Sequence, residues 1–121
     1  MNLLSLQQDE KFKDITVKGY KFKIRYISPL DRVQITQERI RLQGGNPVES
    51  LTQDDFTFFE NIAIVNVCIE EHPKEMNSNE SCLKWEDLEL INMVAAEIRK
   101  HTGEVETKLK KNKPVTGSDK G

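Results

Sequence analysis

The chain lacks the features of a secreted or membrane protein. It contains only two cysteines in 121 residues, which is too few for a disulfide framework. No apolar run approaches the roughly 20 residues that span a bilayer. A signal peptide has a basic region followed by a sustained apolar stretch. The first ten residues contain three leucines but neither of these regions. The sequence therefore predicts a cytoplasmic protein with reduced thiols.

The chain also has no large excess of positive or negative charge. The 18 basic and 20 acidic residues give a net charge of -2, and both signs are interspersed. Nucleic acids and anionic membranes are bound by concentrated basic surfaces, so neither is expected as a partner. The basic residues Lys108 to Lys113 lack interleaved aromatic residues, and we interpret them as a solvated helix end.

Motifs for catalysis, cofactors or metals are scarce. Gly44-Gly45 lacks the further glycines, the lysine and the preceding strand of a phosphate-binding loop. Cys68 and His72 are four residues apart, but with Cys82 and His101 they match no standard metal-binding spacing. Cys68 also lies in the most apolar segment, where a thiolate is disfavoured. The sequence predicts neither an enzyme nor a cofactor or metal site.

Residues 12–27 alternate as the strands of a β-hairpin do. Ile15 and Val17 share one face before Gly19, and Lys18-Gly19 supplies the turn, because glycine adopts positive φ without steric cost. The apolar face after the turn consists of Tyr20, Phe22, Ile24 and Tyr26. A two-stranded hairpin is marginally stable alone, so we expect this face to pack against helices.

A first helix is expected from about Pro29 to Leu42. Ser28 is a typical N-cap followed by proline, and Gly44-Gly45 is typical of a helix end. The apolar stripe that predicts its buried face consists of Leu30, Val33, Gln37 and Ile40, widened by Ile35 and Leu42.

Two further helices follow. Thr52 is the N-cap of the expected central helix, which runs from Gln53 to about Glu71. The β-branched cluster between Ile62 and Ile69 also fits a buried strand, but capping and length favour a helix. A third helix is expected from near Trp85, with an end or a kink at residues 101–103, where Gly103 interrupts the pattern.

These elements predict an α+β fold in which an N-terminal β-hairpin packs on a layer of about three helices. Residues 1–110 form one domain, and residues 111–121 are expected to be a disordered charged tail, because they have no apolar periodicity. The protein-binding surface is expected at Phe58, Phe59 and Met93. A helix cannot direct both phenylalanines into one narrow core seam, so Phe58 is expected to be exposed, although all three central phenylalanines could also fill the core.

Residues 15–33, ITVKGYKFKIRYISPLDRV, resemble the start of tail assembly chaperones of tailed bacteriophages and prophages. The likeness continues loosely through an apolar central helix and a C-terminal helix that opens with Trp85-Glu86-Asp87-Leu88. The resemblance implies a non-enzymatic factor in the host bacterial cytoplasm that binds the tape-measure protein and presents it to tail tube proteins. Self-association is left open.

Two other functions fit the same composition. One is a structural protein of the virion, such as a head-tail connector or tail completion protein. The other is a small regulator or inhibitor of a host protein. Incorporation into purified particles would indicate the first, and affinity capture of a host enzyme would indicate the second.

Overall fold

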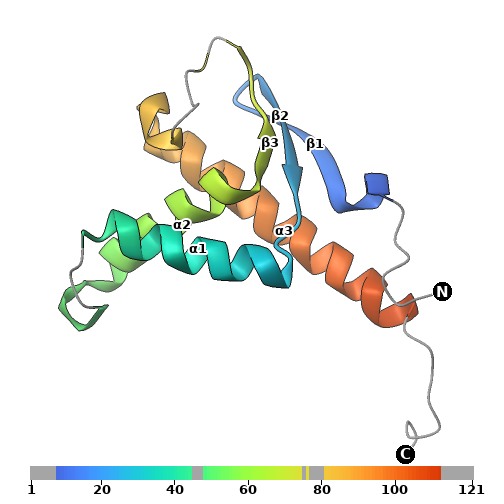
Figure 1. The fold of residues 1–121 in the computed structure, drawn as a ribbon. Coiled ribbons are helices and arrows are strands. Elements are labelled where there is room, and N and C mark those ends of the chain that lie inside the picture. The colour runs from blue at the N-terminus through green and yellow to red at the C-terminus, as the bar shows by residue number, and fades with distance from the viewer. Residues whose placement is uncertain (1–7, 45–47, 75, 77–80, 113–121) are drawn as a thin grey trace, which may run out of the picture.

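The computed structural model describes residues 8–44, 48–74, 76 and 81–112. An antiparallel sheet with the strand order β1-β2-β3 lies on one side of three helices (Figure 1). The strands are β1 (Phe12–Val17), β2 (Tyr20–Arg25) and β3 (Ile69–Glu71), and the helices are α1 (Pro29–Leu42), α2 (Gln53–Cys68) and α3 (Leu88–Asn112). Short 3-10 helices occupy Gln8–Lys11, Val48–Ser50 and Cys82–Trp85. The fold is α+β, as the sequence predicts.

The hairpin of β1 and β2 has the predicted turn. Lys18 and Gly19 have φ values of 53° and 83°, and two left-handed residues match the twist of a two-residue hairpin. Ile15 pairs with Phe22, and both are buried. Of the apolar face expected after the turn, only the centre is buried: Phe22 and Ile24 lie in the core, Tyr20 is exposed, and Tyr26 is half-buried.

Strand β3 was not predicted. Helix α2 ends at Cys68, and Ile69 adopts an extended conformation, so the expected continuation of the helix to about Glu71 is wrong for its last three residues. Ile69 and Glu71 pair with Ile24 and Lys23 of β2. This pairing satisfies backbone groups that would otherwise line an open edge of the hairpin.

Helix α1 has the predicted boundaries but is rotated from the predicted orientation. Its expected buried stripe points to solvent, since Leu30, Val33 and Ile40 are 66%, 53% and 50% exposed. The buried residues of α1 are Asp31 and Ile35, which lie one turn apart. The prediction of the buried face is therefore wrong for Leu30, Val33, Gln37 and Ile40, whereas Ile35 is buried and Leu42 packs against the core as expected. The polar contact of Asp31 described below accounts for the difference.

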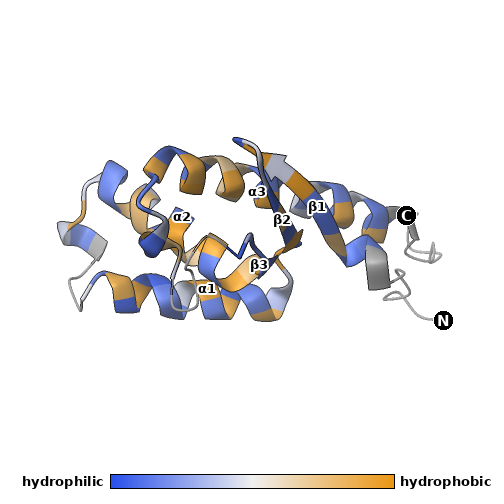
Figure 2. Cartoon of the chain, turned by 90° about the horizontal axis from the view of Figure 1, so that it is seen from above, coloured by the Kyte–Doolittle hydropathy of each residue, from blue (hydrophilic) through white to orange (hydrophobic). Residues whose placement is uncertain are grey.

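Helices α2 and α3 provide most of the helical core. Residues 61–65 of α2 are all buried, and the apolar sides of the helices face inward (Figure 2). Helix α3 begins at Leu88, later than expected, because Asp87 caps it by accepting a hydrogen bond from Leu90 N at 3.0 Å. It continues without interruption through Gly103, so the predicted end or kink at residues 101–103 is wrong.

The end of α3 lies at Asn112, slightly beyond the expected domain boundary at residue 110. The expected disordered tail was residues 111–121. Its first two residues belong to α3, and residues 113–121 lie outside the described residues. None of the helices in the described ranges is long and apolar enough to cross a bilayer.

Candidate protein-binding groove

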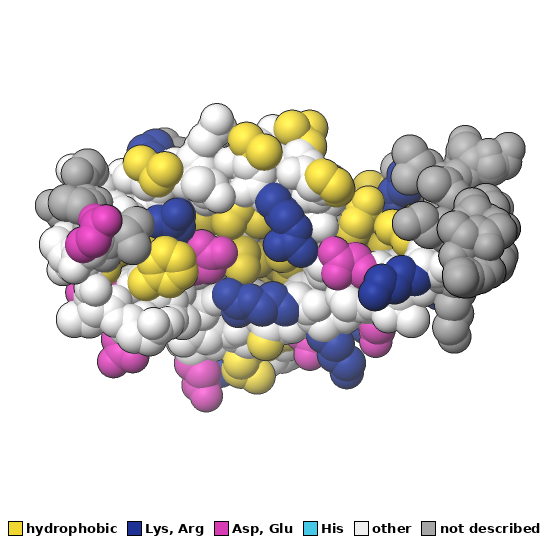
Figure 3. Space-filling model, turned by 90° about the horizontal axis from the view of Figure 1, so that it is seen from below, with side chains coloured by type: hydrophobic (Ala, Val, Ile, Leu, Met, Phe, Trp, Pro, Cys, Tyr) yellow, Lys and Arg dark blue, Asp and Glu magenta, His cyan; other side chains and the backbone are white. Residues whose placement is uncertain are grey.

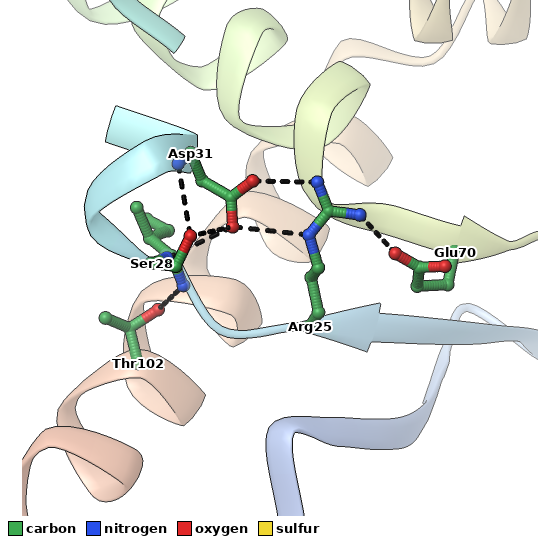
Figure 4. Close-up of polar contacts among 6 residues, drawn as sticks. Arg25, Ser28, Asp31, Glu70 and Thr102 are labelled. Carbon is green, nitrogen blue, oxygen red and sulfur yellow. Dashed lines mark hydrogen bonds and ion pairs between the residues drawn. The ribbon is translucent and has the colours of Figure 1, made fainter. Parts of the chain in front are cut away.

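The orientation of α1 is set by a polar contact with the sheet. Arg25, at the end of β2, donates hydrogen bonds from Nε to Asp31 Oδ2 at 3.2 Å and from Nη2 to Asp31 Oδ1 at 2.8 Å. The same guanidinium also pairs with Glu70 of β3 (Figure 4). Asp31 is only 4% exposed, so α1 can rotate outward only by breaking these charge-assisted bonds.

The same aspartate completes the cap of α1. Asp31 Oδ2 accepts hydrogen bonds from Ser28 N at 3.1 Å and from Ser28 Oγ at 2.9 Å, and Ser28 Oγ accepts one from Asp31 N at 3.1 Å. Burial alone would raise the pKa of Asp31, but the hydrogen bonds from Arg25 and Ser28 hold it below its ordinary value. Asp31 is therefore an ionised acceptor that joins the cap to the sheet.

A second contact ties the start of α1 to α3. Ile27 N donates a hydrogen bond to Thr102 Oγ1 at 2.9 Å, and this hydroxyl donates to Ile98 O at 2.7 Å (Figure 4). Ile27 and Thr102 are both buried. Away from this buried contact the backbones of α1 and α3 lie apart (Figure 2).

The space between α1 and α3 is a groove with a volume of about 460 Å³, which we call the α1–α3 groove. Figure 3 shows this side of the molecule, where hydrophobic side chains form the floor of a hollow and charged side chains lie over it. Three buried isoleucines from different elements contribute to the lining, and Arg32 and Arg99 come from its two walls. The lining residues are Ile27, Arg32, Ile35, Thr36, Glu60, Ile64, Arg99, Thr102, Gly103 and Glu106.

The groove is continuous with two shallower hollows. One shares Arg32 and Thr36 with it and extends over α1 to Val33 and Gln37. Val33 belongs to the exposed α1 stripe, defined here as Leu30, Val33 and Ile40. The other hollow shares Gly103 and Glu106 and extends along α3 to Leu109 and Lys110. The α1 stripe thus adjoins the α1–α3 groove at Val33.

Ion pairs account for most of the charged lining. Arg32 Nη2 lies 3.4 Å from Glu106 Oε2 and so links α1 to α3, while Arg39 Nε lies 3.2 Å from Glu60 Oε1. Arg39 also lies over the ring of Phe56 with its guanidinium carbon 4.7 Å from the ring centroid. Within the described ranges, no acidic side chain pairs with Arg99. Among the described residues, Arg99 is therefore an exposed basic group of the groove without an ion-pair partner.

Gly103 is the smallest residue of the lining. A Cβ atom added there would meet nothing within 4 Å, and its φ lies outside the left-handed range. Glycine in an exposed helix interior costs about 1 kcal/mol relative to alanine. No contact within the described chain requires a glycine here. The backbone of α3 is therefore exposed at Gly103, although a larger side chain would not disturb the packing of the described residues.

The residues predicted to bind protein lie elsewhere. Phe58 is partly buried against the core and meets Phe59 edge-on, with ring centroids 5.3 Å apart. The expectation of an exposed Phe58 is therefore wrong, because its ring packs against the core. Met93 is 41% exposed. None of the three lines the α1–α3 groove, and their role in binding stays a prediction.

The sequence pattern did not predict the residues of the α1–α3 groove as a binding site. Arg32 and Arg99 were indistinguishable from other surface cations, and Thr36 from any exposed polar residue. One signal was available: Gly103 falls within the helical stripe of an otherwise regular segment. It was interpreted as a break in the helix, whereas the helix continues through it.

The cysteines and histidines do not assemble into a site. Cys68 and Cys82 are free and buried, and burial raises the pKa of each thiol to about 12. His101 Nε2 lies 3.1 Å from Lys11 O, and His72 Nδ1 lies 2.9 Å from Pro73 O. The described part of the chain contains no group of three or more His, Cys, Asp or Glu side chains that could hold a metal ion.

Comparison with known proteins adds no family. No protein-family model, no curated protein and no solved structure matches the chain. The likeness of residues 15–33 to tail assembly chaperones therefore stays a prediction from the sequence.

Proposed function

We propose that this chain is a non-enzymatic protein-binding factor that holds an amphipathic helix of its partner in the α1–α3 groove. The observation that carries the proposal is the groove between α1 and α3, which opens over α1 toward the exposed side chain of Val33. Adjoining exposed apolar surface rimmed by polar residues is characteristic of interaction sites. A groove between helices that has isoleucines in its floor and charged residues along its walls suits an amphipathic helix.

The charges of the groove favour a helix over a purely apolar ligand. Arg32, Arg99, Glu60 and Glu106 surround the floor with both signs, so a partner helix needs an apolar stripe with charged flanks. Such charges at the rim select the partner and its orientation more than they add affinity.

The resemblance of residues 15–33 gives the partner we propose. In a tail assembly chaperone, the partner would be the tape-measure protein, whose long helices require cover before the tail tube proteins assemble around them. The groove and the α1 stripe support this role because together they cover one face of a helix without enclosing it.

Site-specific photo-crosslinking tests the proposal. A photo-reactive phenylalanine analogue is placed at Thr36, on the wall of the groove, and the chain is expressed together with a candidate tape-measure protein. The control position is Lys100, which is exposed on α3 and does not line the groove. We expect crosslinks from position 36 and few from position 100.

A third crosslinking position, Met93, tests the binding surface that was predicted from the sequence at Phe58, Phe59 and Met93. Strong crosslinks from position 93 and none from position 36 would move the site to that surface and refute the groove. Failure to form any complex with the tape-measure protein would refute the chaperone role. Thermal melts of each variant establish that the substitutions leave the fold intact.

A further inference from the structure

The exposed backbone at Gly103 and the guanidinium of Arg99 lie on the same face of α3. The two residues are four positions apart and both line the α1–α3 groove, so they are neighbours on the helix surface. Gly103 belongs both to the groove and to the hollow that extends toward Leu109. It therefore lies where a ligand that follows the groove passes along α3.

The glycine has no role that the described chain explains. A Cβ atom would fit there without contact, and the backbone conformation does not require glycine. Gly103 weakens α3, and no other segment of the described chain uses the space that its missing side chain leaves. The close approach of a ligand to the α3 backbone would explain the glycine. Glycine allows the backbone of a ligand to come nearer than any side chain would permit, and the distance between packed helix axes depends on the side chains at the contact.

The charge at Arg99 adds a chemical requirement. Arg32 is paired with Glu106, and Glu60 is paired with Arg39. Within the described part of the chain, a helix bound in the groove therefore meets an exposed guanidinium at Arg99 that has no ion-pair partner. The complementary group is a carboxylate, which a guanidinium binds through two parallel hydrogen bonds.

We infer that the occupant of the groove is an amphipathic helix that crosses α3 at Gly103 and directs an acidic side chain to Arg99. This inference rests on the proposed function and specifies the partner's chemistry: an apolar stripe, a close backbone contact and a carboxylate about one turn away. The partner's small or apolar residues lie over Gly103, and its acid lies beside them.

The first arm of the test separates binding from stability. Gly103→Ala should keep or raise the melting temperature, because it improves helix propensity and its Cβ atom meets nothing within 4 Å. We expect the same of Gly103→Leu, and a thermal melt of that variant checks its fold before binding is measured. Gly103→Leu should weaken binding by about tenfold or more, because the added side chain overpacks the contact. Lys100→Leu is the matched control on the same helix, and it should leave binding unchanged.

The second arm uses two synthetic helical peptides as probes. They share one leucine stripe and differ only in their flanking residues, which are glutamates in one peptide and lysines in the other. The wild-type chain should bind the glutamate peptide more tightly, by up to about fivefold. Arg99→Glu should reverse this preference, whereas Lys100→Glu, which makes the same change of charge outside the groove, should not. Isothermal titration calorimetry measures the affinity of each form of the chain for each peptide.

The outcomes distinguish the inference from the proposed function. If both peptides bind with equal affinity, and neither Arg99→Glu nor Gly103→Leu alters binding, the groove still binds helices but the inference is overturned. If neither peptide binds the wild-type chain, the groove is not a helix site and both fail. Weaker binding by Gly103→Leu without loss of stability, together with the reversal by Arg99→Glu, is the result that supports the inference.

Discussion

Replacing Asp31 with alanine removes the side chain that joins α1 to the sheet. The carboxylate accepts two hydrogen bonds from Arg25 and two from Ser28, at distances between 2.8 and 3.2 Å. Without it, Arg25 retains Glu70 but loses its partner on α1. The start of the helix also loses half of its capping box.

The expected loss of stability follows from these bonds. A hydrogen bond to a charged group contributes about 1.5–3 kcal/mol of net stability, and the half of the capping box that Asp31 supplies adds no more than the roughly 1 kcal/mol of a full N-cap. The bonds share one carboxylate and are not additive, so we expect Asp31→Ala to lower the free energy of unfolding by about 3 kcal/mol. That is at the lower end of the roughly 3–5 kcal/mol for breaking a buried ion pair.

Urea unfolding followed by circular dichroism measures this loss. The control is Glu70→Ala, which removes the other partner of Arg25. Glu70 is exposed, so this variant should lose no more than about 1 kcal/mol. A loss below about 1 kcal/mol for Asp31→Ala, or equal losses for the two variants, would show that the contact between Arg25 and Asp31 does not hold α1 in its orientation.

Three further predictions concern acid stability, the thiols and the two faces of α1. Hydrogen bonds hold the pKa of Asp31 below its ordinary value despite the opposing effect of burial, so the unfolded chain binds more protons at low pH. Urea titrations should show stability that is retained above about pH 4 and lost as the pH falls below it. Burial raises the pKa of Cys68 and Cys82 to about 12, so iodoacetamide at pH 8 should label them only after denaturant is added; rapid labelling of the native chain would contradict this. Val33→Asp should change the free energy of unfolding by less than about 0.5 kcal/mol, whereas Ile35→Ala should lower it by about 2–4 kcal/mol; equal losses would refute the orientation of α1.

The groove itself depends on contacts that join distant parts of the chain. Ile27 and Thr102 are 75 positions apart, and their hydrogen bond brings the start of α1 against α3. Arg32 and Glu106 are 74 positions apart. No periodicity in a single sequence relates such positions, and for this reason the candidate site was predicted at Phe58, Phe59 and Met93 and not in the groove.

The sequence by itself determined the elements whose conformation is local. The turn at Lys18-Gly19, the caps at Ser28 and Thr52 and the left-handed Gly44 after α1 are all present as predicted. Each depends on the backbone preference of one residue or on a hydrogen bond across three positions, so the neighbouring residues are sufficient to predict it.

Only the tertiary structure decided which face of α1 is buried and how α2 ends. Apolar spacing predicted a buried stripe through Leu30, Val33 and Ile40, but the helix is turned so that Asp31 reaches Arg25. Ile69 leaves the helix because the edge of β2 offers it a partner. In both cases, a polar group that must be paired on folding outweighs the local pattern, because an unpaired buried charge or backbone group costs more than the exposure of a few apolar side chains.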